Sequence, residues 1–261
     1  MKHLLESWNE VETRIRRANP LFLLLDYDGT LTPIVARPEQ AACPPGVKSL
    51  LEKLHHSPRA LVAIISGRAL EDLKKKVGVS GITYVGNHGL EMENPAGVHR
   101  KCLSPQRLEE LKQIRKSLEA RLKSIPGIQF EDKGPILTVH YRNAPRDSSR
   151  PVQKAVQEGL ESYPNRWQLS TGKKIFEIRP RMDFDKGKTL KELLQRFPHT
   201  ELLPVYLGDD ESDEDAFRAV HDRGIPVRVG AGPVPSAASY FLRDSSEVLE
   251  FLRRCEKTLR N

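Results

Sequence analysis

Two aspartates follow a short apolar run near the start of the chain. The run is Leu21–Leu25, and Asp26 and Asp28 come directly after it, ahead of Gly29. Two carboxylates this close repel each other unless a cation lies between them. The pattern is typical either of an ordinary surface turn or of a site that holds a metal ion, and the residues that follow the other apolar runs help to distinguish the two.

Polar and charged residues also follow three further apolar runs of strand length, Leu61–Ile65, Ile82–Val85 and Val205–Leu207. A further charged residue, Lys186, lies at the start of a later helical pattern. In an open α/β sheet, ligands bind beyond the carboxyl ends of the strands, so we expect these residues to converge. In chain order they are Ser66, Arg68, Asn87, His88, Lys186, Asp209, Asp210 and Asp213.

This set of side chains suits phosphoryl transfer. Carboxylates from two strands can hold Mg²⁺, which prefers oxygen ligands. One carboxylate can attack phosphorus, and a second can act as general acid to the leaving oxygen and as general base to water. A serine hydroxyl and a lysine ammonium can bind the remaining phosphate oxygens. The residues by themselves therefore predict a Mg²⁺-dependent phosphoryl-transfer enzyme.

The elements that position these residues are predicted from the apolar pattern. The runs are continuous rather than alternating, which is typical of strands buried on both faces of a parallel sheet. Between them, residues 47–54 and 190–197 carry apolar side chains at i, i+3, i+4 and i+7, as amphipathic helices do. Strands that alternate with helices predict an α/β fold with a doubly wound, Rossmann-like parallel sheet.

The middle of the chain has a different pattern. A long charged helix is expected at 105–125, strands at 128–131 and 136–142, a helix at 152–160, and strands at 167–170 and 174–179. These strands carry more polar residues, as expected for a sheet with one face toward solvent. We therefore predict a smaller α+β domain, residues 104–182, inserted into a core formed by residues 1–103 and 183–261.

Four short motifs resemble those of the haloacid dehalogenase superfamily of phosphatases. DYDGT, SGR, DKGK and GDDESDE stand in the order of that superfamily, and the predicted insertion falls between the second and third, where one class of these enzymes carries a substrate cap. Together with GNHGLE and FEIRP, the motifs are more narrowly similar to those of the trehalose-6-phosphate phosphatases, over about residues 20–245.

The resemblance implies roles for the residues at the strand ends. Asp26 would be the nucleophile, forming an aspartyl-phosphate, and Asp28 the general acid and base. Asp26, the backbone carbonyl of Asp28 and Asp209 would ligate Mg²⁺. Ser66 and Lys186 would hold the phosphoryl group.

Two further acids would support the metal ligands without ligating the metal themselves, according to the same resemblance. These are Asp213 and Asp210. For Asp210 a second interpretation stays open, because aspartate is a preferred N-cap and a helix is expected to follow.

The inserted domain would supply groups that bind sugar hydroxyls, which favour charged partners. Glu177 is the best candidate, and Lys173 lies four residues earlier, on the same face of the predicted strand. A salt-bridged row facing solvent is an alternative for Glu177 and Arg179, and His88 is an equally good structural histidine. The remaining substrate-binding candidates are Arg142 and Arg179 in the insertion and Arg68, Asn87 and His88 in the core.

The composition argues against nucleic-acid-binding, membrane and secreted proteins. The 261 residues carry 42 basic and 35 acidic side chains, a net charge of +7, but the basic residues are spread among acidic ones and only 6% of residues are aromatic. No window approaches the ~18 apolar residues of a membrane span, and the polar start has no signal-peptide core. The three cysteines lie far apart, which suits a reducing compartment. We expect a cytoplasmic monomer that binds neither nucleic acid nor membrane.

The resemblance thus implies Mg²⁺-dependent hydrolysis of trehalose 6-phosphate to trehalose and phosphate, a step of trehalose biosynthesis. Two alternatives stay open. The substrate could be another sugar phosphate, such as sucrose-phosphate or mannosyl-3-phosphoglycerate. From a different class, the chain could be a polyanion-binding module that keeps the fold.

Overall fold

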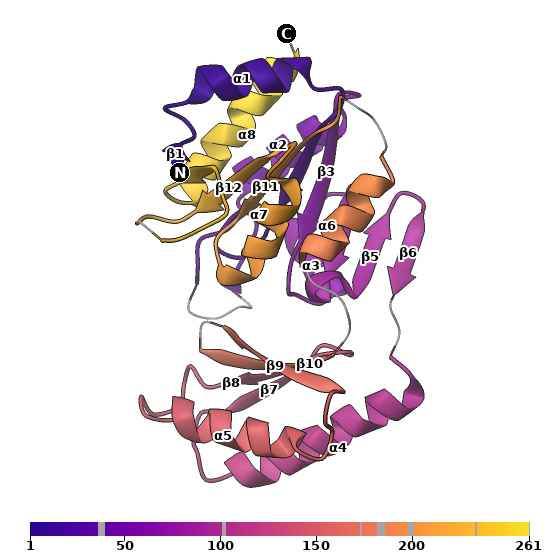
Figure 1. Ribbon diagram of the computed structural model, residues 1–261, viewed down its shortest axis with the longest axis vertical. Helices are drawn as coiled ribbons and strands as arrows, with labels where there is room; N and C mark the ends of the chain where they lie inside the picture. The colour runs from indigo at the N-terminus through magenta and orange to yellow at the C-terminus, as the bar shows by residue number, and fades with distance from the viewer. Residues whose placement is uncertain are drawn as a thin grey trace. The chain divides into compact units, whose positions relative to one another are not determined.

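A computed structural model of the protein describes residues 1–35, 40–100, 103–172, 174–181, 186–197, 201–232 and 234–260. The chain divides into a larger unit, residues 1–99 with 184–261, and a smaller unit, residues 100–183. Each unit is built around its own sheet, and among the described residues the larger unit has nine strands and the smaller unit four (Figure 1).

The sheet of the larger unit is mostly parallel, in the order β1-β13-β12-β11-β2-β3-β4-β5-β6. Its central strand is β2 (Leu21–Leu25), which is buried at every residue and pairs in parallel with β11 (Leu203–Gly208) and β3 (Ala60–Ile65). Because these strands run in one direction, their carboxyl ends meet at one edge of the sheet. The other parallel strands are β4 (Thr83–Gly86), β12 (Ile225–Val229) and β13 (Tyr240–Leu242).

Alternate residues of β2 pack into two separate apolar layers. Leu21, Leu23 and Leu25 belong to one cluster, whereas Phe22 and Leu24 belong to another. The first layer is formed with α1 (Trp8–Arg17), α2 (Pro45–His55), α3 (Leu70–Val77) and α8 (Ser245–Arg260), and the second with α6 (Lys186–Gln195) and α7 (Glu214–Val220). Cover on both faces explains the continuous apolar run, and the predicted doubly wound α/β fold is confirmed.

Three short strands at the sheet edges are not predicted by the sequence pattern. β1 (Lys2–His3) pairs in parallel with β13, and β5 (Glu91–Asn94) pairs antiparallel with β4. β6 (Gly97–Arg100) completes this edge. Segments this short and polar carry too little periodicity to be distinguished from loops.

The smaller unit has a four-stranded antiparallel sheet, in the order β7-β8-β10-β9. Alternate residues, among them Val139 and Phe176, join an apolar cluster with α4 (Pro105–Leu122) and α5 (Ser149–Leu160). The other face carries a polar row formed by residues in register, Glu131, Thr138, Glu177 and Ser170. The strands are β7 (Gln129–Asp132), β8 (Leu137–His140), β9 (Trp167–Gly172) and β10 (Ile175–Pro180).

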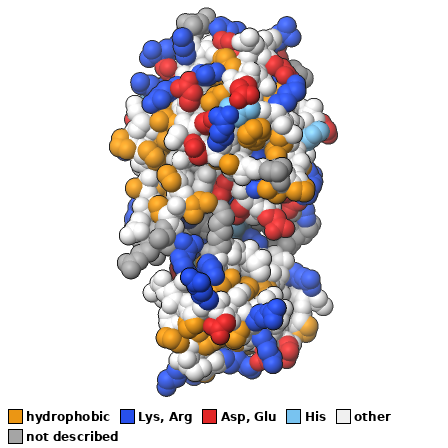
Figure 2. All heavy atoms as spheres, turned by 90° about the vertical axis from the view of Figure 1, so that its left-hand side faces the viewer, with side chains coloured by type: hydrophobic (Ala, Val, Ile, Leu, Met, Phe, Trp, Pro, Cys, Tyr) orange, Lys and Arg blue, Asp and Glu red, His pale blue; other side chains and the backbone are white. Residues whose placement is uncertain are grey.

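Charges of both signs are mixed on the face of the molecule that Figure 2 shows. Figure 2 shows Lys and Arg side chains spread among Asp and Glu side chains. On α8, for example, Arg254 and Arg260 each form an ion pair with a glutamate four residues earlier. Of the helices in the described part of the chain, none combines the length and the apolar character needed to cross a bilayer.

Candidate active site

The carboxyl edge of the larger sheet holds the predicted nucleophile. Asp26 follows β2 directly, and its backbone N–H donates to the carbonyl of Leu207 at 2.9 Å, so the pairing with β11 extends to this residue. On the other side of β2, Ser66 follows β3 and donates its N–H to Val85 of β4. Both side chains are buried, as expected from the convergence of parallel strands.

The Lys186 ammonium joins two carboxylates at this edge. Nζ donates to Oδ1 of Asp26 at 2.9 Å and to Oδ1 of Asp213 at 2.6 Å, and all three residues are buried. Burial alone lowers the pKa of Lys186, but the charges of Asp213 and Asp26 outweigh it and raise this pKa well above its ordinary value. The lysine is therefore held as a cation between two acids.

One lysine does not offset the acidic charge of the cluster. Burial and the charges of Asp213 and Asp209 raise the pKa of Asp26 well above its ordinary value, against the opposing effect of Lys186. Asp26, Asp209 and Asp213 each offer a carboxylate oxygen, and these atoms lie within 4.8 Å of one another. A cluster of oxygen donors with excess negative charge fits Mg²⁺.

The chain after β2 passes directly against Asp209. Gly29 has a φ of +86°, and a Cβ atom at this position would lie 2.2 Å from Oδ2 of Asp209. Any other residue would push the Asp209 carboxylate away from the DYDGT turn. Glycine is therefore required at this position for the acids of the two strands to meet.

Asp213 is held by protein donors on both oxygens. Oδ1 accepts from Lys186 and from the hydroxyl of Tyr206 at 2.7 Å, and Oδ2 accepts from the backbone N–H of Asp210 at 3.1 Å. This arrangement favours a supporting role for Asp213 over direct metal ligation. Tyr206 is not among the predicted residues, because it stands inside an apolar strand and nothing in its neighbours marks it.

Asp210 caps the short 3₁₀ helix that follows it, η3 (Glu211–Asp213). Its carboxylate accepts from the backbone N–H of Ser212 at 2.9 Å and from the Ser212 hydroxyl at 2.7 Å. Burial raises the pKa of Asp210, but the charge of Lys186 and the bonds from Ser212 lower it overall. Asp210 is therefore the N-cap of η3, and its support of the metal ligands stays a prediction.

Arg68 lies against Asp28. Its Nε and Nη2 donate to the two carboxylate oxygens of Asp28, and Nη1 donates to Asp72 at 2.8 Å. Its guanidinium also lies 5.5 Å from the centre of the Tyr27 ring. A residue predicted to bind substrate is thus placed beside the predicted general acid and base.

Asn87 and His88, the other two candidates in the larger unit, are hydrogen-bonded to the loop after β3. They lie in η2 (Asn87–Gly89), where Asn87 donates its N–H to Arg68 at 2.7 Å and His88 donates its N–H to Ser66 at 3.0 Å. The His88 ring lies against Gly67, because a Cβ atom there would be 2.6 Å from the imidazole. Asn87 and His88 both have positive φ, 49° and 56°. Strained backbone of this kind occurs at functional sites.

Glu91 joins these two segments and is missed by the sequence-based prediction. Its Oε2 accepts from the Asn87 side-chain amide at 2.8 Å and from the Leu70 N–H, at the start of α3, at 3.3 Å. The residue ends the GNHGLE segment, which is the one sequence signal that marks it. Glu91 therefore helps to set the position of Asn87 beside the loop after β3.

In the smaller unit, Glu177 has a lysine neighbour. Lys133, in the loop after β7, donates to Oε1 of Glu177 at 2.9 Å, and Thr138 donates to the same oxygen at 3.3 Å. Lys133 is missed by the prediction because it lies 44 residues from Glu177 in the sequence. The predicted partner, Lys173, lies outside the described residues.

The remaining two candidates of the smaller unit have different surroundings. Arg179 follows Glu177 by two residues on β10 and lies on the same face of the sheet, where its Nε donates to the Ser170 hydroxyl at 2.9 Å. Arg142 is exposed in the turn after β8. Glu177 and Arg179 thus lie on the polar face of this sheet, whereas Arg142 lies beyond the strand end.

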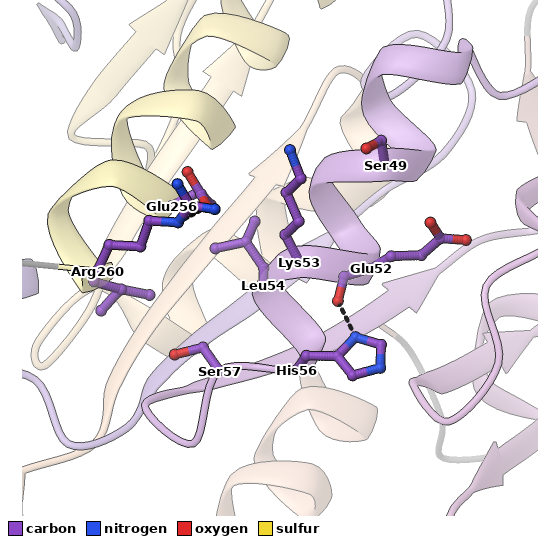
Figure 3. Close-up of a pocket in the computed structure, with 9 residues that line it drawn as sticks. Ser49, Glu52, Lys53, Leu54, His56, Ser57, Glu256 and Arg260 are labelled. Carbon is purple, nitrogen blue, oxygen red and sulfur yellow. Dashed lines mark hydrogen bonds and ion pairs between the residues drawn. The ribbon is translucent and has the colours of Figure 1, made fainter.

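A surface hollow of the larger unit lies away from these residues. It is lined by side chains of α2, of the two residues after α2 and of α8, among them Glu52, Lys53, His56 and Glu256 (Figure 3). His56 follows α2 and precedes the amino end of β3, so the hollow lies at the edge of the sheet opposite Asp26. None of its described lining residues belongs to the carboxylate cluster.

Residues 24–246 match the trehalose-phosphatase family. The chain belongs to this family. The family resemblance predicted from the motifs is thereby confirmed. A trehalose-phosphate phosphatase of Mycobacterium bovis (strain BCG / Pasteur 1173P2) is 39% identical over 245 residues, which are 91% of this chain and 62% of that protein. The chain therefore spans less than two thirds of the length of this relative.

The solved structures of a family relative and of a haloacid dehalogenase-like hydrolase share the fold. The C-terminal domain of the trehalose-6-phosphate phosphatase of Candida albicans has a TM-score of 0.84 and 25% identity, and the match covers 95% of this chain and 96% of that one. A haloacid dehalogenase-like hydrolase from Bacteroides thetaiotaomicron has a TM-score of 0.67 at 15% identity, covering 90% and 99%, and shows likeness of fold alone. This member of the trehalose-phosphatase family thus has a haloacid dehalogenase-like fold.

Proposed function

We propose that this chain is a Mg²⁺-dependent phosphatase that hydrolyses trehalose 6-phosphate to trehalose and phosphate. The observation that carries the proposal is that Asp26 and Asp213 share the Lys186 ammonium. Asp209 lies close to these two acids, and Asp26 and Asp209 follow two adjacent parallel strands. The identity of the sugar in the proposed substrate rests on the family and on the names of the relatives. The residues alone support phosphoryl transfer without specifying the sugar.

The proposed reaction has two displacements at phosphorus. A carboxylate oxygen of Asp26 attacks the phosphorus atom, the bond from phosphorus to the sugar oxygen breaks, and Asp28 gives its proton to that oxygen. Asp28 then accepts a proton from water, which attacks the aspartyl-phosphate and releases phosphate with Asp26 restored. Lys186 and Ser66 bind phosphoryl oxygens in both displacements.

Mg²⁺ would be held by Asp26, the backbone carbonyl of Asp28 and Asp209. When bound, it supplies positive charge that offsets the carboxylates and the negative charge of the phosphoryl oxygens. Asp213 supports this site by holding Lys186, and Asp210 supports it by donating its N–H to Asp213. Chelation of the metal is therefore expected to abolish turnover, and added Mg²⁺ to restore it.

We propose that residues 104–182 act as a substrate cap on a core formed by residues 1–103 and 183–261. In the cap, the Glu177 carboxylate with Lys133 offers an acceptor and a donor of the kind that sugar hydroxyls bind. Lys173, Arg179 and Arg142 are further candidates there, as are Arg68, Asn87 and His88 in the core.

We propose a cytoplasmic location, because three cysteines far apart in the sequence suit a reducing compartment. We also propose that the protein is a monomer that binds neither nucleic acid nor membrane; for nucleic acid, the support is that the basic residues are spread among acidic ones.

The test is turnover of a panel of phosphate esters by the purified protein with Mg²⁺. We expect kcat/KM for trehalose 6-phosphate to exceed that for sucrose-phosphate, mannosyl-3-phosphoglycerate and glucose 6-phosphate by about a hundredfold or more. A rate no better than that for glucose 6-phosphate would reject trehalose 6-phosphate as the substrate. Absence of turnover, together with steeply salt-dependent DNA binding, would favour the polyanion-binding alternative.

A further inference from the structure

Tyr206 binds Asp213, the carboxylate partner of Lys186, from inside the sheet. It lies on β11, two residues before the strand ends, and is fully buried in the apolar layer formed with α6 and α7. Its ring packs edge-on against Phe217 of α7, with the ring centres 5.7 Å apart. Its hydroxyl is directed away from this apolar contact, to Oδ1 of Asp213 at 2.7 Å.

The same Asp213 oxygen binds the lysine. Oδ1 accepts from the Tyr206 hydroxyl and from Lys186 Nζ, whereas Oδ2 accepts from the backbone N–H of Asp210. The three donors come from β11, from α6 and from the loop after β11. Together they fix both the position and the plane of a fully buried carboxylate.

Lys186 in turn divides its donors between two acids. Nζ lies 2.6 Å from Oδ1 of Asp213 and 2.9 Å from Oδ1 of Asp26. A change in the orientation of Asp213 therefore changes the position of the ammonium relative to the proposed nucleophile. Small displacements matter here because phosphoryl transfer depends on the alignment of the groups around phosphorus.

We infer that Tyr206 is a positioning residue: its hydroxyl holds Asp213 in the orientation that keeps the Lys186 ammonium beside Asp26. This role rests on the proposed phosphoryl transfer. Tyr206 does not touch the substrate. It acts through Asp213 and Lys186, and loss of its hydroxyl leaves Oδ1 of Asp213 with one donor in place of two, so the carboxylate and the ammonium it binds are less tightly fixed.

The test is the Tyr206→Phe variant, which removes the hydroxyl and keeps the ring that packs on Phe217. We expect kcat to fall about tenfold for both trehalose 6-phosphate and 4-nitrophenyl phosphate, since Lys186 acts on the phosphoryl group that the two esters share. Calorimetric titration with inorganic phosphate in the presence of Mg²⁺ should show about tenfold weaker binding for the same reason.

A matched control is Tyr84→Phe. Tyr84 on β4 is also buried, and its hydroxyl bonds the backbone of Val79 in the other apolar layer. This variant also loses one buried tyrosine hydroxyl, so thermal unfolding of the two variants measures the loss of stability that such a change causes by itself. We expect its kcat and its phosphate affinity to stay within about twofold of the wild type.

A double variant tests whether Tyr206 acts through Asp213. Once Asp213→Asn has removed the carboxylate, adding Tyr206→Phe should reduce phosphate affinity by less than about twofold further. Unchanged kcat and phosphate affinity in Tyr206→Phe, equal losses in Tyr84→Phe, or fully additive losses in the double variant would each overturn the inference. If the wild type hydrolyses neither ester, the proposed function fails, and the phosphate titration still decides the role of Tyr206.

Discussion

Arg68 binds both carboxylate oxygens of Asp28, with nitrogen–oxygen distances of 2.7 Å to each. A bidentate pair fixes the plane of a carboxylate as well as its position. Asp72 and the ring of Tyr27 hold the guanidinium from two other sides. The residue proposed as general acid and base is therefore oriented by a side chain that follows a different strand.

Arg68→Lys is expected to lower kcat for trehalose 6-phosphate about tenfold or more, with KM changed less than about threefold, because lysine keeps the charge but cannot bind both oxygens in one plane. Steady-state kinetics measure the two constants separately. Arg115→Lys, in an exposed ion pair on α4, is the control and should leave both constants unchanged. A raised KM with unchanged kcat would instead mean that Arg68 acts only in the substrate binding proposed for it and does not orient Asp28.

Asp26→Asn should lower kcat by at least about a thousandfold, because the amide is a far poorer nucleophile than the carboxylate. Acid quenching of the wild type during turnover, followed by peptide mass spectrometry, should detect a phosphoryl group on the peptide that contains Asp26. The control is Asp222→Asn, which changes an exposed aspartate after α7. Turnover that persists in Asp26→Asn would mean that another residue is the nucleophile.

Lys186→Met should reduce the free energy of unfolding by about 3–5 kcal/mol, since it leaves the buried carboxylates of Asp26 and Asp213 without their shared cation. Urea denaturation in the absence of Mg²⁺ measures the loss. Lys188→Met, two residues along the same helix and less buried, should cost about 1 kcal/mol or less. Similar losses in both variants would contradict the special role of the Lys186 pair.

Glu177→Ala should lower kcat/KM for trehalose 6-phosphate about thirtyfold or more and change that for 4-nitrophenyl phosphate less than about threefold, because the aryl ester has no sugar hydroxyls to bind. Glu161→Ala removes an exposed carboxylate after α5 and is the control. Equal losses with the two esters would assign Glu177 to stability or to the chemistry and not to sugar recognition.

Glu131 makes the smaller unit sensitive to acid. Burial alone raises its pKa, but the hydrogen bond with His140 and the charge of Lys133, opposed by the charge of Glu177, lower the pKa overall from its ordinary value of 4.5. A lowered pKa in the folded state means that the ionised form stabilises the fold above pH 4.5 and that this stability is lost as the pH falls through the folded value.

Glu131→Gln should therefore lower Tm by about 1–3 °C at pH 6, and the difference from the wild type should shrink toward zero below pH 4. Thermal unfolding across this range measures both, and Glu161→Gln, an exposed glutamate after α5, should show no such dependence. A difference that stays constant with pH would mean that the charge of Glu131 does not contribute.

The central strands and the residues that follow them are predictable from local pattern. β2 has the predicted bounds, because its run of apolar residues ends at a charged residue, as is typical of a buried strand that leads into a site. The edge strands β1 and β5 are not predictable in this way. They are strands because an already formed sheet offers them a hydrogen-bonding edge, which their own residues do not encode.

The sequence by itself determined which residues could do the chemistry. Asp26, Ser66 and Asp209 each follow a buried strand, and the rule that parallel strands end at one edge is enough to bring them together. The tertiary structure decided which side chains hold the other candidate site residues in place. Arg68 with Asp28, Tyr206 with Asp213, Lys133 with Glu177, and Glu91 with Asn87 and Leu70 are the contacts of this kind. Tyr206 lies near Asp213 in the chain, and Glu91 lies near Asn87, but the other pairs join residues that are 21 or more positions apart. All of them depend on sheet order, strand register and the direction of each side chain, none of which a local pattern contains.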